Sequence, residues 1–266
     1  MLLETGRGEK RHGSCGMGIW EATLRTRAGF DITVEWVKNN SVEDILNRLK
    51  SIRRDYVLPR IKSEKIDVNI DENLCELITT DDILESFAKL IKENSECVEI
   101  RETSKEFFES YENVIFESGQ GLCLDADCVE NFPHVSASKT GINNVIRILD
   151  SVNLKLDEAV YITRTYLTKH GAGPLPNEDP ILMFDFELDD DTNVYNNWQG
   201  DIRYARFGSA SEVMNRVKKD IDTCPYDVKS ALFVTHLNET SNNILVIDGD
   251  VKLEDYLKAS RDVFDK

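Results

Sequence analysis

The 266-residue sequence lacks the features that identify a membrane, secreted or metal-binding protein. No stretch approaches the roughly 18 consecutive apolar residues that a membrane span needs. The opening residues, MLLETGRGEKRHG, have no apolar core of the kind found in a secretory signal. The six cysteines form no CxxC pair, and the four histidines are scattered. We therefore expect a cytoplasmic protein with reduced thiols, no membrane contact and no structural metal.

Positive charge is also scarce. Lys and Arg number 32 against 49 Asp and Glu, which gives a formal net charge of −17. This field repels polyanions, so a nucleic-acid-binding role would need a concentrated basic face. The dense basic cluster from Arg7 to His12 lies in a Gly-rich stretch, residues 6–19, that predicts a loop suited to one small phosphate. A solvated, poorly ordered terminus is the alternative. We predict no nucleic-acid partner.

The central part of the chain, from Val114 to Glu178, has the pattern of a βαβ unit. Val114 to Phe116 is an apolar run that predicts a buried strand, and the Gly-rich turn ESGQG follows it. Ala159 to Thr163 predicts a second strand, which leads into the loop KHGAGPLP. Glycines leave backbone amides open to a ligand, and parallel strands end at one edge of a sheet. Both loops are therefore candidates for binding at that edge.

Other segments have helical or strand periodicity. The pattern Ser-Val-Glu-Asp at Ser41 predicts a capped helix to Leu58. Further helices are expected at 81–91, 104–111, 141–152, 209–221 and 253–264, and further strands at 181–186, 231–235 and 244–247, with an acidic loop at 187–191. These elements predict one α/β domain over residues 1–266, with a mainly parallel central sheet, helices on both faces and a helical insertion at about 40–112.

Three motifs occur here in an order and spacing found in a known family. ESGQGLCLDAD, FPHVSASKTG and YITRTYLTKHGAGPLPNE together resemble adenylosuccinate synthetase, the purine-pathway ligase that joins IMP to aspartate at the expense of GTP. The resemblance covers most of residues 1–240. It implies a nucleoside triphosphate as substrate, GTP or ATP, a Mg²⁺ ion, and a homodimer.

The resemblance also implies a purine monophosphate site. The stretch GSCGMG is similar to the family's phosphate-binding loop, with Cys15 where a second hydroxyl is usual. The family sends an arginine from just after this loop into the neighbouring subunit, and Arg25 or Arg27 is the candidate; surface arginines at a helix end are the alternative. Gln120 suits the site because an amide both donates and accepts. The implied monophosphate-binding residues are Ser14, Cys15, Gly16, Arg25, Gln120 and Ser136, although Ser136 and Ser138 could instead cap a helix.

Two further groups follow from the same resemblance. Lys169, with Gly171 and Gly173, stands in the ribose-contacting loop, and lysine replaces the usual arginine, so it keeps the charge without the bidentate fork. Arg203 and Arg206 are the implied ligands of the aspartate carboxylates, because a guanidinium pairs with a carboxylate through two hydrogen bonds.

The acidic pair Asp125 and Asp127 has two interpretations. Two carboxylates at i and i+2 of an extended segment point to one side, as a metal pair or an acid–base couple would. Aspartates that stabilise turns and loops are much commoner, and we favour that interpretation.

The implied nucleotide-base site is Thr235, His236 and Asn238, in the sequence THLNE. The family has a Thr-Lys-Leu-Asp type of sequence here, and its aspartate accepts hydrogen bonds from guanine. Asn238 offers one acceptor and one donor, so a hydrogen bond to guanine would be left unmade at a cost of about 1–3 kcal/mol. An adenine base could suit the asparagine better.

The family's phosphate loop, GDEGKGK, does not occur in the sequence. The nearest stretch, GRGEKRHG, lacks the lysine-after-glycine arrangement. Positioning of the phosphates supplies most of the catalysis in phosphoryl transfer, so this chain should not run the reaction alone. Three explanations stay open: a fragment or split enzyme whose partner chain supplies the loop, an inactive relative that binds nucleotide, or a different chemistry at an inherited site.

Overall fold

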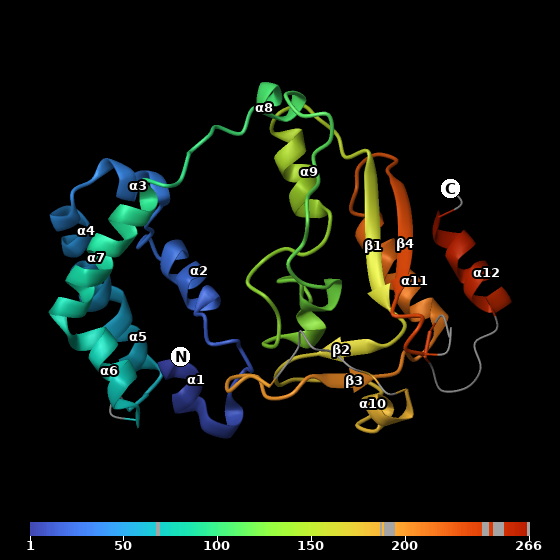
Figure 1. Cartoon of the computed structure of the whole chain (residues 1–266), viewed down its shortest axis with the longest axis horizontal. Coiled ribbons are helices and arrows are strands. Elements are labelled where there is room, and N and C mark those ends of the chain that lie inside the picture. The colour runs from blue at the N-terminus through green and yellow to red at the C-terminus, as the bar shows by residue number, and fades with distance from the viewer. Residues whose placement is uncertain (68–69, 187, 189–194, 241–244, 247–252, 265–266) are drawn as a thin grey trace. The chain divides into compact units, whose positions relative to one another are not determined.

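The computed structural model describes residues 1–67, 70–186, 188, 195–240, 245–246 and 253–264 (Figure 1). The chain divides into two compact units, Met1–Glu102 and Thr103–Lys266. The single domain with a helical insertion at about 40–112 stays a prediction. In the part of the chain that the structure describes, no helix has the length and apolar character needed to cross a membrane.

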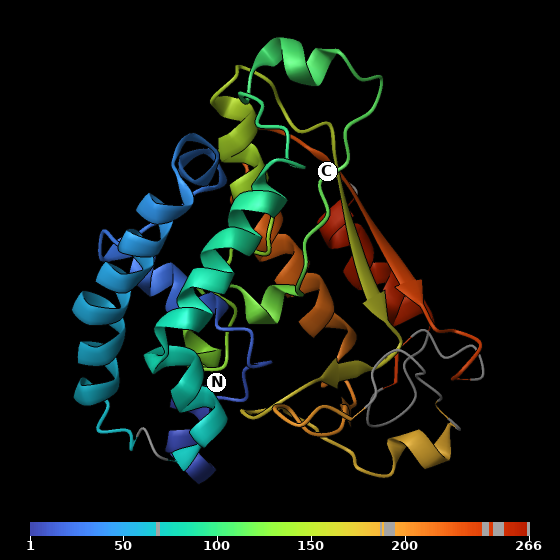
Figure 2. The same ribbon diagram turned by 60° about the vertical axis from the view of Figure 1, so that its left-hand side comes forward.

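The N-terminal unit is built from helices, and its described residues contain no strand (Figure 2). Helix α4 begins at Ser41 as the sequence predicts, because Ser41 and Asp44 form a reciprocal capping box. Its buried face, Ile45 and Leu49, packs against Val37 and Ala88. The helices are α1 (Leu2–Arg7), α2 (Ile19–Arg27), α3 (Val34–Asn39), α4 (Val42–Ile52), α5 (Leu58–Ser63), α6 (Glu72–Thr79) and α7 (Asp81–Ser95), with a 3-10 turn at Gly8–Lys10 and a π-turn at Arg53–Val57.

The loop predicted over residues 6–19 is partly wrong. Helix α1 continues to Arg7 and the 3-10 turn follows it. Glu4 explains the difference, because its buried carboxylate pairs with Arg7 and accepts hydrogen bonds from the backbone of His12 and Gly13. This local network folds a Gly-rich stretch back onto its own helix.

The C-terminal unit contains the sheets. Strand β1 (Glu158–Arg164) pairs in parallel with β4 (Lys229–Thr235), and β2 (Leu167–Lys169) pairs in an antiparallel manner with β3 (Arg203–Ala205). The α/β class with a parallel pair is confirmed, as are the strands expected at 159–163 and 231–235. The helices of this unit are α8 (Lys105–Glu109), α9 (Asn143–Asp150), α10 (Leu182–Asp185), α11 (Ala210–Ile221) and α12 (Leu253–Phe264).

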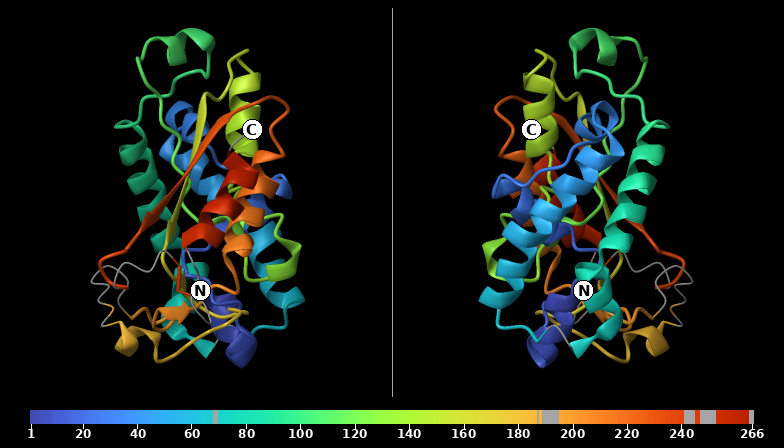
Figure 3. Two further views of the ribbon diagram at one scale, coloured as in Figure 1. Left: turned by 90° about the vertical axis from the view of Figure 1, so that its right-hand side faces the viewer. Right: turned by 90° about the vertical axis from the view of Figure 1, so that its left-hand side faces the viewer.

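One face of the parallel pair meets the main core. Helices α11 and α12 lie side by side (Figure 3), and Tyr161, Leu232 and Val234 pack against the cluster that these helices form. The opposite face, where the sequence predicts further helices, carries exposed apolar side chains: Ile162 is 72% exposed and Phe233 is 57% exposed. The alternation follows from the period of two residues along a strand.

Two strand predictions are wrong. Val114–Phe116 forms no strand, and Ile115 is 89% exposed. An apolar run becomes a buried strand only when a neighbouring strand satisfies its backbone, and no described residue pairs with this one. Residues 182–185 form the helical turn α10, which starts where the Asp179 carboxylate accepts a hydrogen bond from the backbone of Ile181. Most of the acidic loop at 187–191, and the two end residues of the strand predicted at 244–247, lie outside the described residues.

Candidate functional site

The carboxyl ends of β1 and β4 lie at one edge of the sheet because the two strands are parallel. Thr165 follows β1 directly and is fully buried. Its backbone N–H donates to Thr235 at 3.2 Å, and its carbonyl accepts from Val246 at 2.7 Å. These bonds fix the backbone just beyond the two strand ends. Tyr166, which comes after β1, and His236, which comes after β4, therefore lie at the same edge of the sheet.

A polar cluster, Tyr166, His236 and Glu239, stands at this edge. The Tyr166 hydroxyl donates to Glu239 Oε2 at 2.5 Å, and His236 Nδ1 lies 2.6 Å from Glu239 Oε1. His236 adopts a positive φ of 63°, an uncommon backbone conformation for a residue with a side chain. The two rings meet edge to face at 6.0 Å, so Glu239 fixes the orientation of both.

The charge state of Glu239 sets the tautomer of His236. Burial raises the pKa of Glu239, but the hydrogen bonds from Tyr166 and His236 and the charges of His236 and Arg164 together lower it below its ordinary value. The ionised carboxylate can only accept, so His236 Nδ1 carries the proton. In the neutral imidazole, Nε2 is then the acceptor. The pKa of Tyr166 is raised by burial and by Glu239, which keeps its hydroxyl a donor.

Arg203 holds the second Gly-rich loop in place. Its Nη1 donates to the carbonyls of Gly171 and Gly173, each at 2.9 Å. Its Nε and Nη2 form a bidentate pair with Glu178 at 2.7 and 2.5 Å. All three guanidinium nitrogens are therefore engaged within this unit. Arg203 thus positions the loop, whereas the resemblance implies that it binds an aspartate substrate.

Arg206 is engaged in the same way. Its Nε meets Asp179 Oδ2 at 2.8 Å, and its Nη2 lies 3.3 Å from Asp185 Oδ2. A carboxylate ligand would have to replace one of these side chains. The implied aspartate site stays a prediction for both arginines.

Lys169, at the end of β2, is a half-buried cation. Burial lowers its pKa, and the positive charge of Arg203 lowers it further. Gly171, two residues later, is buried and has a φ of 80°. A bound anion beside Lys169 would offset the repulsion from Arg203, which agrees with a phosphate or ribose contact but does not test it.

The other two motifs are tied together by Asp125. Its Oδ2 accepts from the Thr140 backbone at 2.6 Å, and its Oδ1 accepts from Asp127 N at 2.8 Å. The backbones of Ser136 and Leu124 are joined at 2.7 Å. Asp125 thus stabilises the loops, the commoner of the two roles considered, and Asp127 contacts Lys139.

Ser136 and Ser138 do not cap helix α9. Their hydroxyls bond to each other at 2.8 Å. The helix start is instead held by Asp220 of α11, whose Oδ2 accepts from Ile142 N at 3.1 Å and from the Tyr161 hydroxyl at 2.8 Å. Burial raises the pKa of Asp220, and these two hydrogen bonds lower it by less.

Gln120 is exposed at the tip of the first Gly-rich loop. The Ser118 hydroxyl donates to its carbonyl at 3.1 Å, and a Cβ added at Gly119 or Gly121 would meet no atom within 4 Å. The loop is therefore open to solvent on this side.

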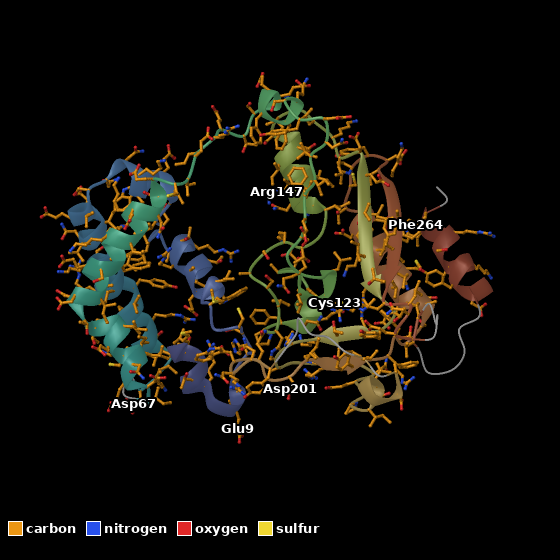
Figure 4. All side chains as sticks on the ribbon, in the orientation of Figure 1. Glu9, Asp67, Cys123, Arg147, Asp201 and Phe264 are labelled. Carbon is orange, nitrogen blue, oxygen red and sulfur yellow. The ribbon has the colours of Figure 1, made fainter. Side chains whose placement is uncertain are left out.

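In Figure 4 Cys123 lies beside β2, and the pKa of its thiol is raised by burial and lowered in part by Arg216.

The remaining predicted residues lie in the N-terminal unit, except for Asn238. Ser14 and Cys15 are exposed, Gly16 is buried, and the Gly16 amide donates to the Ser14 hydroxyl at 3.2 Å. Gly16 and Gly18 have φ values of 76° and 77°, so this stretch is a turn that glycine adopts without strain. Arg25 lies in the last turn of α2. The asparagine of the predicted base site, Asn238, is exposed in the C-terminal unit.

A metal site cannot be assembled from the described residues, because no three His, Cys, Asp or Glu side chains among them are grouped to hold an ion. The Mg²⁺ ion that the family resemblance implies stays a prediction.

Sequence reasoning missed the residues that hold the site. Glu178, Asp220 and Glu239 each act on a partner far away in the chain. In the sequence they are ordinary acidic residues of an acidic protein. The sequence offers one indication of their role: Glu178 ends the motif YITRTYLTKHGAGPLPNE, and Glu239 ends the sequence THLNE.

Comparison with known proteins gives one family. A sequence model of adenylosuccinate synthetase matches residues 1–222. The adenylosuccinate synthetase of Alteromonas mediterranea is 28% identical over 177 residues, which is 66% of this chain and 38% of that protein. That of Francisella philomiragia is 34% identical over 83 residues, 31% of this chain and 17% of that protein. That of Francisella tularensis subsp. novicida is 36% identical over 66 residues, 25% of this chain and 15% of that protein. The matched part thus spans well under half the length of these relatives.

Proposed function

Because the chain belongs to the adenylosuccinate synthetase family, we propose that it is the purine nucleotide-binding portion of a ligase of that kind. The reaction would join IMP, or a related purine monophosphate, to aspartate with GTP or ATP. The observation that supports this most is the contact among three motifs. Asp125 of the first motif bonds Thr140 of the second, and a Cβ at Gly173 of the third would lie 2.4 Å from His134 of the second.

The proposed roles follow the groups that each segment offers. Ser14, Cys15, Gly16, Arg25, Gln120 and Ser136 would hold the purine monophosphate, with Lys169, Gly171 and Gly173 at the ribose. Gln120 is suited to this because its amide is exposed and can donate and accept. Arg203 and Arg206 would receive the aspartate only after exchange of their present carboxylate partners.

The proposed base site is the edge where β4 ends. Thr235, His236 and Asn238 would face the nucleotide base there, with His236 oriented by Glu239. An acceptor at His236 Nε2 and the mixed donor and acceptor of Asn238 suit the exocyclic amine and ring nitrogen of adenine. GTP and ATP both stay within the proposal, and ATP is the expected preference.

The proposal includes a setting for the protein. By family we expect a cytoplasmic homodimer that takes part in purine biosynthesis. A separate chain could supply the phosphate loop that the sequence lacks, together with the Mg²⁺ ligands that the described residues do not provide.

A second candidate is a catalytically silent nucleotide-binding or scaffold protein. One observation favours it: the guanidinium groups of Arg203 and Arg206 are already occupied by Glu178, Asp179 and Asp185. A site whose substrate-binding cations are neutralised by the protein itself is suited to holding structure, and not to capturing a dicarboxylate.

Isothermal titration calorimetry with IMP, GMP and their deoxy forms tests the first proposal. We expect one of them to bind, and Gln120→Ala to weaken that binding about tenfold, the loss expected for one hydrogen bond to a charged ligand. Gln199→Ala is the matched control and should bind as the original chain does. If none of the four nucleotides binds, the purine site is refuted.

Turnover tests the second candidate. The purified chain is incubated with IMP, aspartate and either GTP or ATP, and adenylosuccinate is measured. Product formed by the chain alone would rule out the silent protein. Binding of IMP without product, with or without Mg²⁺, fits both candidates, because the sequence lacks the phosphate loop.

A further inference from the structure

The N-terminal unit contains an apolar pocket, and Arg25 is the one residue of its lining that the proposed ligase function uses. Its volume is about 360 Å³, within the range of small-molecule sites, roughly 300–1,000 Å³. The residues that line it belong to the segment 25–98 of this unit. Its apolar wall is formed by Val34, Val37, Leu49, Phe87, Ile91 and Val98.

Arg25 is the charged side chain of this pocket. It stands in the last turn of α2, and its Nε is buried and has no hydrogen-bond partner. A buried donor that has lost water without gaining an acceptor costs free energy. A ligand that brings an acceptor to Arg25 Nε would therefore form the hydrogen bond that this atom lacks.

The carboxylates nearest in sequence do not serve Arg25. Glu21, one turn earlier on α2, is held by Arg60 through two hydrogen bonds of 3.1 Å. Other arginines of this unit have carboxylate partners: Arg53 pairs with Asp81, and Arg48 lies 3.7 Å from Asp31. In a chain with a net charge of −17, an arginine that lacks such a partner beside an apolar wall stands out.

The other residues that line the pocket indicate which chemical class of ligand it would bind. Ser95 is buried, and its hydroxyl already donates to Lys92 at 2.6 Å, so it offers little to a polar ligand. Val34, Phe87 and Val98 are 45%, 46% and 43% exposed, although they are large apolar side chains. Covering them removes apolar surface from water, which favours a ligand whose body is hydrocarbon.

We propose that this pocket binds a small monocarboxylate with an apolar body, whose carboxylate pairs with Arg25 and whose hydrocarbon part lies against Phe87 and its apolar neighbours. A guanidinium binds a carboxylate through short, charge-assisted hydrogen bonds. The proposal shares Arg25, and no other residue, with the proposed purine monophosphate site. It gives Arg25 a role within its own unit, whereas the family resemblance implies a role in a neighbouring subunit.

Calorimetry on the full chain tests the proposal with three probes: decanoate, 2-naphthoate and 1-decanol, each below its aggregation limit. We expect decanoate or 2-naphthoate to bind, and the better of the two tells whether the body is aliphatic or aromatic. Decanol should bind at least tenfold more weakly than decanoate, because it lacks the charge that pairs with Arg25. This comparison needs no variant.

A matched pair of variants assigns the effect to one residue. Arg25→Met keeps the apolar stem and should weaken decanoate binding about tenfold. Arg27→Met removes a charge from the same helical turn, at an exposed position outside the pocket lining, and should leave binding unchanged. Far-UV circular dichroism checks that both variants keep their helices.

Three results would overturn the proposal. They are no binding of either carboxylate, equal affinity for decanoate and decanol, and equal losses in the two variants. IMP titrations run on the same samples keep this test apart from the purine site, since IMP binding with no decanoate binding refutes only the carboxylate pocket.

Discussion

Two Gly-rich loops of the C-terminal unit have similar composition, but other segments contact one of them closely and leave the other largely exposed. The loop around Gly119 is open: a Cβ added there would meet nothing within 4 Å, and the run before it forms no strand. The loop around Gly173 is closed: Arg203 bonds its carbonyls, and its α-carbon lies against His134. The difference arises from distant residues and not from the glycines themselves.

This contrast shows what a Gly-rich motif predicts. Glycine permits an unusual backbone conformation, but a second segment has to select one conformation from those permitted. At Gly173 that segment is β3 with Arg203, and the selected φ is 99°. At Gly119 an added Cβ would meet no atom within 4 Å, and the nearby carbonyl of Gly121 accepts one hydrogen bond, from the Thr140 hydroxyl at 3.2 Å.

Gly173→Ala should give the largest effect. The substitution places a Cβ 2.4 Å from the His134 ring on a backbone with a φ of 99°, so both sterics and backbone strain oppose it. We expect a loss of about 3 kcal/mol in unfolding free energy by urea titration. Gly119→Ala is the control and should change stability by less than about 0.5 kcal/mol. Equal losses would erase the contrast between the loops.

Arg203→Met should give the second-largest loss of unfolding free energy. It removes the bidentate pair with Glu178 and both bonds to the loop carbonyls. Because the pair is partly exposed, we expect about 2 kcal/mol, less than for a fully buried pair. Hydrogen exchange should speed up at residues 171–173 and stay unchanged at 118–121. Arg203→Lys should recover little of this lost stability, because a lysine ammonium cannot form the bidentate pair of a guanidinium.

Asp125→Ala tests one of the bonds that join the segment after the open loop to the second motif. The change leaves the backbone N–H of buried Thr140 without its acceptor, so we expect a loss of about 1–2 kcal/mol. Asp127→Ala removes an exposed carboxylate that contacts Lys139, and should cost less than about 0.5 kcal/mol. Denaturant unfolding measures both. A larger loss at Asp127 would reverse the roles assigned to the two aspartates.

The smallest effect is a change in pH dependence at Asp220. Burial raises its folded pKa above the unfolded value, so its contribution to stability is full below the unfolded pKa and is lost as pH rises through the folded pKa. Asp220→Asn keeps an acceptor for Ile142 and Tyr161 but cannot ionise. Its stability relative to the original chain should therefore improve between pH 4 and pH 7. Exposed Asp227→Asn is the control, and an equal change there would contradict the assignment.

Local signals in the sequence predicted much of the fold. Ser41 and Ser209 accept the hydrogen bonds that start α4 and α11, because a cap is read from neighbouring residues. The strand at 159–163 was found for a similar reason, through an apolar run between polar residues. The run at 114–116 has the same local pattern and is no strand, since a strand also needs a partner that the run itself does not encode.

The site was predicted less well, for the same physical reason. The motifs identified which loops to consider, but not that Arg203 would be taken up by Glu178, or that His236 would be oriented by Glu239. These pairings depend on the register of β2 with β3 and of β1 with β4. Register is a property of the folded chain, and single-sequence patterns leave it open.

Two long-range hydrogen bonds of the C-terminal unit also bear on how the chain folds. Asp220 reaches Ile142 across 78 positions, and Glu239 reaches Tyr166 across 73. Closing segments of that length is entropically costly and slow compared with winding a helix. We therefore expect these two bonds to form after the local helices, once synthesis has passed residue 239.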